Sequence, residues 1–279
     1  MKLANANEAA IPGQSSRAMT ADFRAKPAML AADDSGPGSS WRSSASYRHV
    51  SMQVRHAFEL VRTGRWDLPD FQRPFVWRPA QVSALADSLW RGYPIGHLLI
   101  WESARISGPA WVADGQQRLT SLCLLFGAQP PWWSRRRSDE RNLRRGFELF
   151  FDLEALAPPF FQCASSGKVR ESTRPLIPVS EILTHDPLTK SGKAALQMLA
   201  AGVERRGSRS MSEDQLYRAL HRVAMIQHRP LAATSLQDCD LDDVIEIFQR
   251  LNSRGTRFRR LLLNFAMRSL VAASRASFG

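Results

Sequence analysis

The chain has 279 residues, a formal net charge of +12 and a sequence pI of about 10.7. This length suits one sizeable domain with an appendage, and the basic surplus favours phosphate-bearing partners such as nucleic acids. The cysteines Cys123, Cys163 and Cys239 stand far apart without a C-x-x-C pair or a neighbouring histidine, which argues against a disulfide scaffold and a structural zinc site. No apolar run approaches the roughly 18 residues of a membrane span, so we expect a soluble, reducing, cytoplasmic protein.

The first 46 residues predict a disordered tail. They are rich in Ala, Ser, Gly and Pro and carry no periodic apolar face, so they cannot bury enough surface to offset the entropy of ordering. The pattern changes from Val50 on. Apolar residues between Val54 and Val61 recur on one side of a helix that ends at Gly64.

An extended, aromatic-rich segment follows, from Trp66 to Trp77. Two prolines within it forbid a long regular helix. Gln72 and Arg73 are the polar exceptions in this stretch, and two interpretations stay open. Arg73 either forms a structural salt bridge or cap, or Gln72 and Arg73 both face a functional pocket.

Next come a helix and two strands that lead to a tight turn. Pro79 begins a helix that ends at Arg91, and the apolar runs His97–Trp101 and 110–113 predict strands. No second ligand candidate lies near His97 in the sequence. We therefore interpret His97 as a packed histidine.

The turn itself, Asp114-Gly115, precedes a helix that begins at Gln116. Apolar residues there recur at three- and four-residue spacing, and Asp114 occupies the place expected for the N-cap. Gly115 permits a close backbone turn, and the free N–H groups and positive dipole end of the helix attract phosphate.

Four polar side chains of this helix are candidate phosphate ligands. Arg118 offers a planar fork of donors, Gln116 and Gln117 offer neutral donors and acceptors, and Thr120 offers a hydroxyl. The alternative is an ordinary capped helix with solvated polar residues.

Two tryptophans followed by arginines form a second candidate site. Basic residues beside aromatic rings can grip a phosphate backbone and stack bases. The alternative is a solvated insertion whose tryptophans cover the edge of the core. The residues concerned are Trp132, Trp133, Arg135, Arg136 and Arg137.

The rest of the chain predicts a strand, a loop region and a helical part with one further strand. The last helix ends in a polar, glycine-containing stretch in which Asn252, Arg254, Gly255 and Thr256 could converge on a phosphate or base. A plain helix stop is the alternative. The expected elements are a strand at 147–153, a loop at 155–175, a strand and turn at 176–183, helices at 187–203 and 213–226, a strand at 231–236 and a helix at 242–251.

The pentapeptide Asp114-Gly115-Gln116-Gln117-Arg118 resembles the D-G-Q-Q-R signature of the GmrSD-type restriction endonuclease N-terminal domain family, a branch of the ParB/sulfiredoxin-like superfamily. The segments 68–77 and 247–256 fit the same family in the same order. The resemblance implies an α+β fold over residues 47–260, with a small mixed sheet flanked by helices and a helical C-terminal part. The chain departs from the family pattern after Thr256, so we expect 261–279 to be the start of a truncated helical extension.

If the three segments meet, the pocket suits a nucleoside triphosphate with Mg²⁺. Asp114, Arg118, Gln117 and Arg73 are then the candidate catalytic residues, with Asp114 as the magnesium ligand. The first hypothesis is nucleotide binding and hydrolysis in a DNA-directed, type IV restriction-like bacterial defence system.

The resemblance also implies a partner for the nuclease chemistry. The family's His-Asn-His-type nuclease commonly resides in a separate domain, and the six histidines of this chain are dispersed. Two alternatives remain: a non-catalytic ParB-like module that senses nucleotide or DNA, and a domain that nicks DNA through Asp114 and Arg118.

Overall fold

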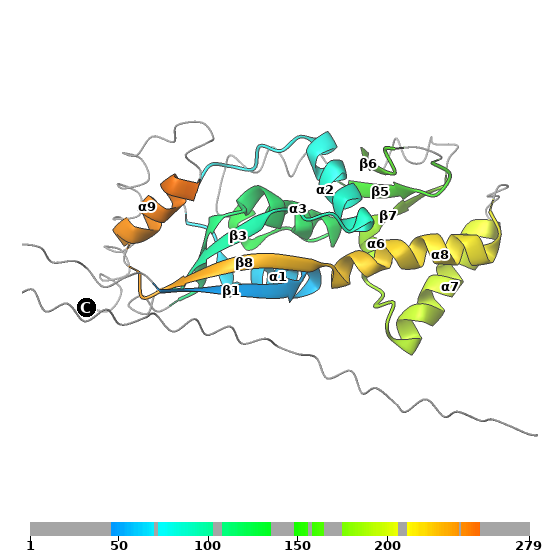
Figure 1. The fold of residues 1–279 in the computed structure, drawn as a ribbon. Coiled ribbons are helices and arrows are strands. Elements are labelled where there is room, and N and C mark those ends of the chain that lie inside the picture. The colour runs from blue at the N-terminus through cyan, green and yellow to red at the C-terminus, as the bar shows by residue number, and fades with distance from the viewer. Residues whose placement is uncertain are drawn as a thin grey trace, which may run out of the picture. The chain divides into compact units, whose positions relative to one another are not determined.

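The computed structural model describes most of the chain between residues 46 and 251, within one unit, Ser44–Gly279 (Figure 1). The expected tail, 1–46, lies outside the described residues apart from Ser46, and so does the expected extension, 261–279. The described ranges are 46–69, 72–102, 108–134, 148–155, 158–164, 175–205, 211–239 and 241–251.

A five-stranded mixed sheet forms the centre of the fold, in the order β1-β8-β3-β4-β2. β1 is antiparallel to β8, β8 is parallel to β3, β3 is antiparallel to β4, and β4 is parallel to β2. β3 reads HLLIW and is buried after its first residue, as expected for a strand covered on both faces. The strands are β1 Ser46–Gln53, β2 Trp66–Asp67, β3 His97–Trp101, β4 Ala110–Asp114 and β8 Pro230–Gln237.

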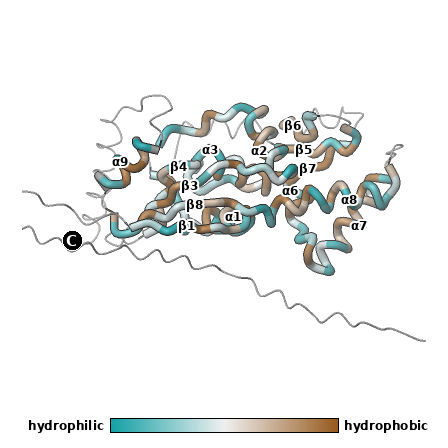
Figure 2. Tube along the Cα trace, viewed as in Figure 1, coloured by the Kyte–Doolittle hydropathy of each residue, from teal (hydrophilic) through white to brown (hydrophobic). Residues whose placement is uncertain are grey.

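Helices cover both faces of this sheet. On one face, α1 (Val54–Arg62) and α3 (Gln116–Leu125) join the main core, and Phe58 stacks on Phe126 with ring centroids 4.2 Å apart. On the other face, Val244 and Ile245 of α9 (Leu241–Leu251) belong to a smaller apolar cluster with β3 and β8. Hydrophobic and hydrophilic stretches alternate along α7, α8 and α9 in Figure 2, as on helices that bury a single face.

A second sheet of three antiparallel strands, in the order β6-β5-β7, packs against α2 (Pro79–Arg91). The contact is aromatic: the Trp90 ring of α2 lies 4.9 Å from Phe160 and 6.3 Å from both Phe151 and Phe161. The strands are β5 Glu148–Asp152, β6 Phe161–Ala164 and β7 Leu176–Pro178.

The remaining helices follow this small sheet. Ser212 caps α8 by accepting a hydrogen bond from the Gln215 amide, and the Gln215 side chain accepts from the Ser212 amide in return, a capping box. The elements are α6 Val179–Leu183, α7 Lys190–Arg205, α8 Glu213–Ala224, and the short 3₁₀ helices η1 Pro131–Trp133 and η2 Met225–His228.

The expected α+β architecture is confirmed, with a small mixed sheet flanked by helices. Three strands were not predicted. β1 lies between the predicted tail and the predicted helix and shares only Ser46 with the tail, β2 is part of the segment predicted only as extended, and β6 lies in the expected loop region. β1 is an edge strand in which only Val50 and Met52 are partly buried, so its alternation is too short to identify. Among the described residues, no helix is long and apolar enough to cross a membrane.

Candidate functional site: the β4–α3 turn

The turn between β4 and α3 depends on one glycine. Gly115 adopts φ 99°, and a Cβ atom there would lie 2.2 Å from Cδ2 of Leu98. Only glycine therefore lets α3 begin this close to β3. Gly115 is the N-cap residue, and Asp114 is the last residue of β4, so the prediction of Asp114 as the N-cap was wrong. Gly115 has no side chain with which to cap α3, and no side-chain cap is present at this N-terminus among the described residues.

Arg118 is held rigidly beside this helix end. Its Nη2 donates to Oδ2 of Asp114 at 3.2 Å, and its Nη1 donates to the carbonyl of Ile95 at 3.2 Å. The Arg118 side chain is 17% exposed and that of Asp114 42%. Burial lowers the pKa of the Arg118 guanidinium, and the Asp114 carboxylate opposes the shift. The Arg118 guanidinium is therefore a fixed, mostly buried cation, and the Asp114 carboxylate paired with it is accessible to solvent.

Gln116 and Gln117 both bind the main chain of the segment before α2. Oε1 of Gln117 accepts from the amides of Val76 (2.9 Å) and Trp77 (3.2 Å), and its Nε2 donates to the Pro74 carbonyl at 3.2 Å. Nε2 of Gln116 donates to the Arg73 carbonyl at 2.6 Å. Both glutamines are buried. Their side-chain amides bind the main chain of residues 73–77, so a role as phosphate ligands, or of Gln117 as a catalytic residue, stays a prediction that would require these hydrogen bonds to break.

Gln72 also joins residues 72–77 to the turn, through hydrogen bonds to β4. Its Nε2 donates to the carbonyls of Val112 (2.8 Å) and Ala113 (3.2 Å) in β4. Residues 72–77 and the turn at Asp114 therefore lie together, as the sequence predicted. Gln72 acts in this contact as a main-chain clamp. Arg73 is exposed on the clamped segment.

Thr120 and the two tryptophans lie in the core. The Thr120 hydroxyl belongs to a residue with no exposed surface and accepts from Nε1 of Trp132 at 3.3 Å, so it cannot serve as the predicted phosphate ligand in this structure. Trp132 and Trp133 are 1% and 2% exposed. Their rings are not available for base stacking, which agrees with the alternative that they cover the core edge.

Two groups of predicted site residues lie outside the described part of the chain. Nothing can therefore be placed at the turn from the segment after α9 or from the arginines after η1. These residues are Arg135, Arg136 and Arg137, and Asn252, Arg254, Gly255 and Thr256.

Sequence reasoning missed a histidine pair near Arg118. His97 begins β3 at a position that is exposed, and its ring packs edge-on against His49 with ring centroids 5.9 Å apart. Nε2 of His97 lies 2.6 Å from Oγ1 of Thr234, and Nδ1 of His49 lies 3.0 Å from the same oxygen. The pKa of His97 is lowered, first by burial and then by His49 and Arg118. His49 lies on β1, Thr234 on β8 and His97 on β3, and these three strands are adjacent in the sheet. The order of strands in a sheet cannot be inferred from the pattern of a single sequence.

Carboxylates that could bind a magnesium ion are sparse at the turn. Among the described residues, no group of three or more His, Cys, Asp or Glu side chains could hold a metal ion. Asp114 is a single, partly exposed carboxylate beside a helix N-terminus. Such a site suits Mg²⁺ that arrives on phosphate oxygens and takes one protein ligand, and does not suit an all-protein metal cage.

Comparison with known families gives one match. The family model described as GmrSD restriction endonuclease, N-terminal domain, matches residues 54–261. This range runs from the start of α1 past the end of α9 and includes the turn, the clamped segment and the expected third motif. No curated protein matches the chain.

Proposed function

The chain belongs to the GmrSD restriction endonuclease N-terminal domain family, a domain of restriction systems, and on this premise we propose that its β4–α3 turn binds and hydrolyses a nucleoside triphosphate. One observation carries the proposal. The uncapped N-terminus of α3 lies beside the immobilised guanidinium of Arg118.

An uncapped helix start presents amide donors and the positive end of the helix dipole to an anion. Arg118 adds a positive charge that is held by Asp114 and the Ile95 carbonyl, and two glycines leave the space that its guanidinium occupies. A Cβ at Gly96 would lie 2.4 Å from Nη1 of Arg118, and one at Gly115 would lie 3.4 Å from Nη2. A preorganised cation stabilises charge that develops on a transferred phosphoryl group without having to reorganise during the reaction.

Asp114 and Arg73 complete the proposed chemistry. Asp114 would orient the attacking water or hold Mg²⁺ on the phosphates, and Mg²⁺ would supply neutralisation of phosphate charge when bound. Arg73, exposed on the clamped segment, would be a second cation for the phosphates. In the restriction system, DNA and a His-Asn-His-type nuclease domain or subunit would be the partners.

A binding module without hydrolysis is the second candidate. The observation that favours it is that Gln117, the predicted catalytic amide, makes three hydrogen bonds to the main chain. Asp114 is at the same time paired with Arg118. Nucleotide would then change the conformation of the domain without being cleaved.

The test is phosphate release from ATP, GTP, CTP and UTP with Mg²⁺, with and without DNA, alongside nucleotide affinity by calorimetry. The variants are Arg118→Ala and Asp114→Ala. The matched controls are Arg218→Ala and Asp214→Ala, which break an exposed Asp–Arg pair of the same i,i+4 spacing on α8.

We expect Arg118→Ala to lose both affinity and turnover and Asp114→Ala to lose turnover while keeping part of the affinity, with the α8 variants unchanged. Circular dichroism and Arg118→Lys, which keeps the charge but loses the fork, check that a loss is not unfolding. Saturable affinity without turnover selects the binding module. Equal turnover in wild type and Arg118→Ala would refute the site.

A further inference from the structure

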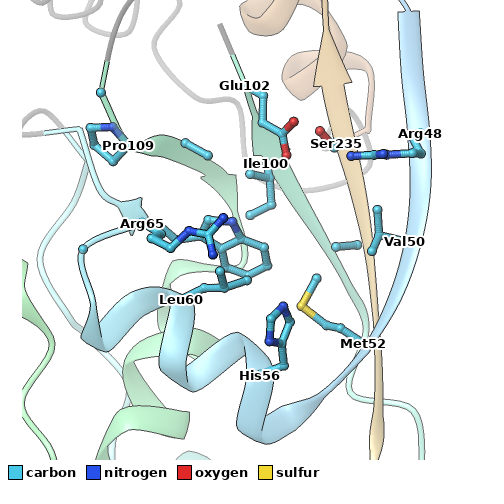
Figure 3. Close-up of a pocket in the computed structure, with 15 residues that line it drawn as sticks. Arg48, Val50, Met52, His56, Leu60, Arg65, Ile100, Glu102, Pro109 and Ser235 are labelled. Atoms are coloured by element: carbon cyan, nitrogen blue, oxygen red, sulfur yellow. The ribbon is translucent and has the colours of Figure 1, made fainter.

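A cavity of about 660 Å³ lies between α1 and the five-stranded sheet, at the end of the sheet opposite the β4–α3 turn. Figure 3 shows Met52 of β1 and His56 and Leu60 of α1 on one part of its wall, with Ile100 of β3 behind them. The buried Trp66 also lines it. This volume is typical of sites for small organic molecules, and the wall offers apolar contact to a planar body.

Two of the side chains that line the cavity, Arg48 and Arg65, are cationic. Figure 3 shows Arg48 and Arg65 approaching the cavity from opposite sides, with His56 below them. Among the described residues, none of these three side chains has a hydrogen-bond or ion-pair partner, and both arginines are exposed. Two guanidinium groups without carboxylate partners at the mouth of one cavity favour an anionic ligand.

Glu102 and Ser235, which lie near Arg48 in Figure 3, add two groups that can bind hydrogen-bond donors or acceptors. Glu102 is held in place by Gln237, whose Nε2 donates to its Oε2 at 3.1 Å. The Ser235 hydroxyl oxygen is buried and has no partner among the described residues. A buried polar atom without a partner is costly, and a ligand or an ordered water that reached it would remove that cost.

We propose that this cavity is a second ligand site and takes a single nucleotide, with the monophosphate held by Arg48 and Arg65. The base would lie along the apolar wall, with its N–H groups donating to Glu102. Inorganic phosphate alone would leave this wall unused. The nucleotide can come from a free nucleoside monophosphate or from an unpaired position in DNA.

The cavity is separate from the turn proposed for the triphosphate. On this face of β4, Ala110 lines the cavity, Val112 is fully buried in the core, and Asp114 lies at the turn. The four residue steps of strand from Ala110 to Asp114 span roughly 13 Å.

The test is calorimetric titration of the full chain in a phosphate-free buffer. One arm uses dAMP, dGMP, dCMP and dTMP, and the other uses a short duplex with one unpaired base against the same duplex fully paired. The variants are Arg48→Gln and Arg65→Gln. The control is Arg218→Gln, which removes the same charge from an exposed position on α8.

Loss of a charge-assisted hydrogen bond predicts an affinity about ten-fold weaker or more for each cavity variant, and little change for Arg218→Gln. Binding of monophosphates identifies a free nucleotide, and preference for the unpaired duplex identifies DNA as the source. Glu102→Gln should change the ranking of the four bases, and an unchanged ranking contradicts the proposed orientation.

Failure of both ligand arms, or equal weakening in Arg218→Gln, overturns the proposal. Arg118→Ala separates this site from the turn. It should abolish triphosphate turnover and leave cavity binding intact, whereas Arg65→Gln should do the reverse. Either proposal can therefore fail without the other.

Discussion

Replacing Gln117 by alanine tests whether this motif residue positions the clamped segment or acts on a substrate. The change removes the acceptor for the amides of Val76 and Trp77 and the donor to the Pro74 carbonyl. At about 0.5–1.5 kcal/mol per net hydrogen bond, discounted because residues 76 and 77 are not fully buried, we expect a loss of about 2 kcal/mol in the free energy of unfolding. The segment should also loosen before the domain unfolds.

The assay is urea denaturation combined with hydrogen exchange at the Val76 and Trp77 amides. The matched control is Gln81→Ala on α2, which removes one exposed hydrogen bond to the Arg78 amide and should cost about 0.5 kcal/mol. If Gln117→Ala unfolds like wild type and both amides keep their protection, the clamp does not hold the segment. Gln117 would then be free for catalysis after all.

Three further outcomes follow from the structure. Gly115→Ala should lower the free energy of unfolding by about 3 kcal/mol, because the new Cβ would sit at a left-handed φ and overlap Leu98. Gly64→Ala, which also has a positive φ (70°) but no atom within 4 Å of the new Cβ, should lower it by about 1 kcal/mol. Thermal denaturation of the two variants measures the difference. Burial raises the pKa of Cys123 to about 12 and also raises that of the partly buried Cys163. At pH 8 an aromatic disulfide reagent should therefore label Cys163 slowly in the folded protein and Cys123 more slowly still, and prompt labelling of Cys123 would show that it is not buried. The Leu188 amide, followed by His228, holds the pKa of Asp186 below its ordinary 3.8. The Asp186 carboxylate therefore stabilises the fold at neutral pH and loses that contribution as the pH falls below about 4, so Asp186→Ala should show a shallower acid-unfolding limb than wild type.

Much of the fold could be predicted because the spacing of apolar residues agrees with the proline and glycine signals at the ends of helices. Pro79 at the start and Gly92 after the end define α2, where Gly92 is left-handed with φ 79°. β3 and β8 are apolar runs of strand length, and both lie in the interior of the sheet. The sheet order could not be predicted. β1 and β8 pair residues as distant as Ser46 and Gln237, and no local signal specifies such a contact.

The contact between residues 72–77 and the turn at Gly115 is present in the structure, and whether these residues form a ligand site stays a prediction. Residue types alone do not show whether an amide faces a ligand or a main chain. Gln116 and Gln117 looked like phosphate ligands because glutamine can do both. Thr120 looked like one because helix periodicity does not show how deeply a turn is buried.

The clamp also changes how a loss of activity in a motif variant must be interpreted. Gln116 and Gln117 are consecutive on α3 and therefore point about 100° apart, yet both bind residues 73–77. Two neighbouring side chains of α3 therefore hold the segment that carries Arg73. If the turn hydrolyses a nucleotide as proposed, a variant of Gln117 should lower turnover by releasing Arg73. Turnover across a series of Gln117 variants should therefore track the hydrogen-exchange protection of residues 76 and 77. A variant that kept protection but lost turnover would assign the amide a direct role.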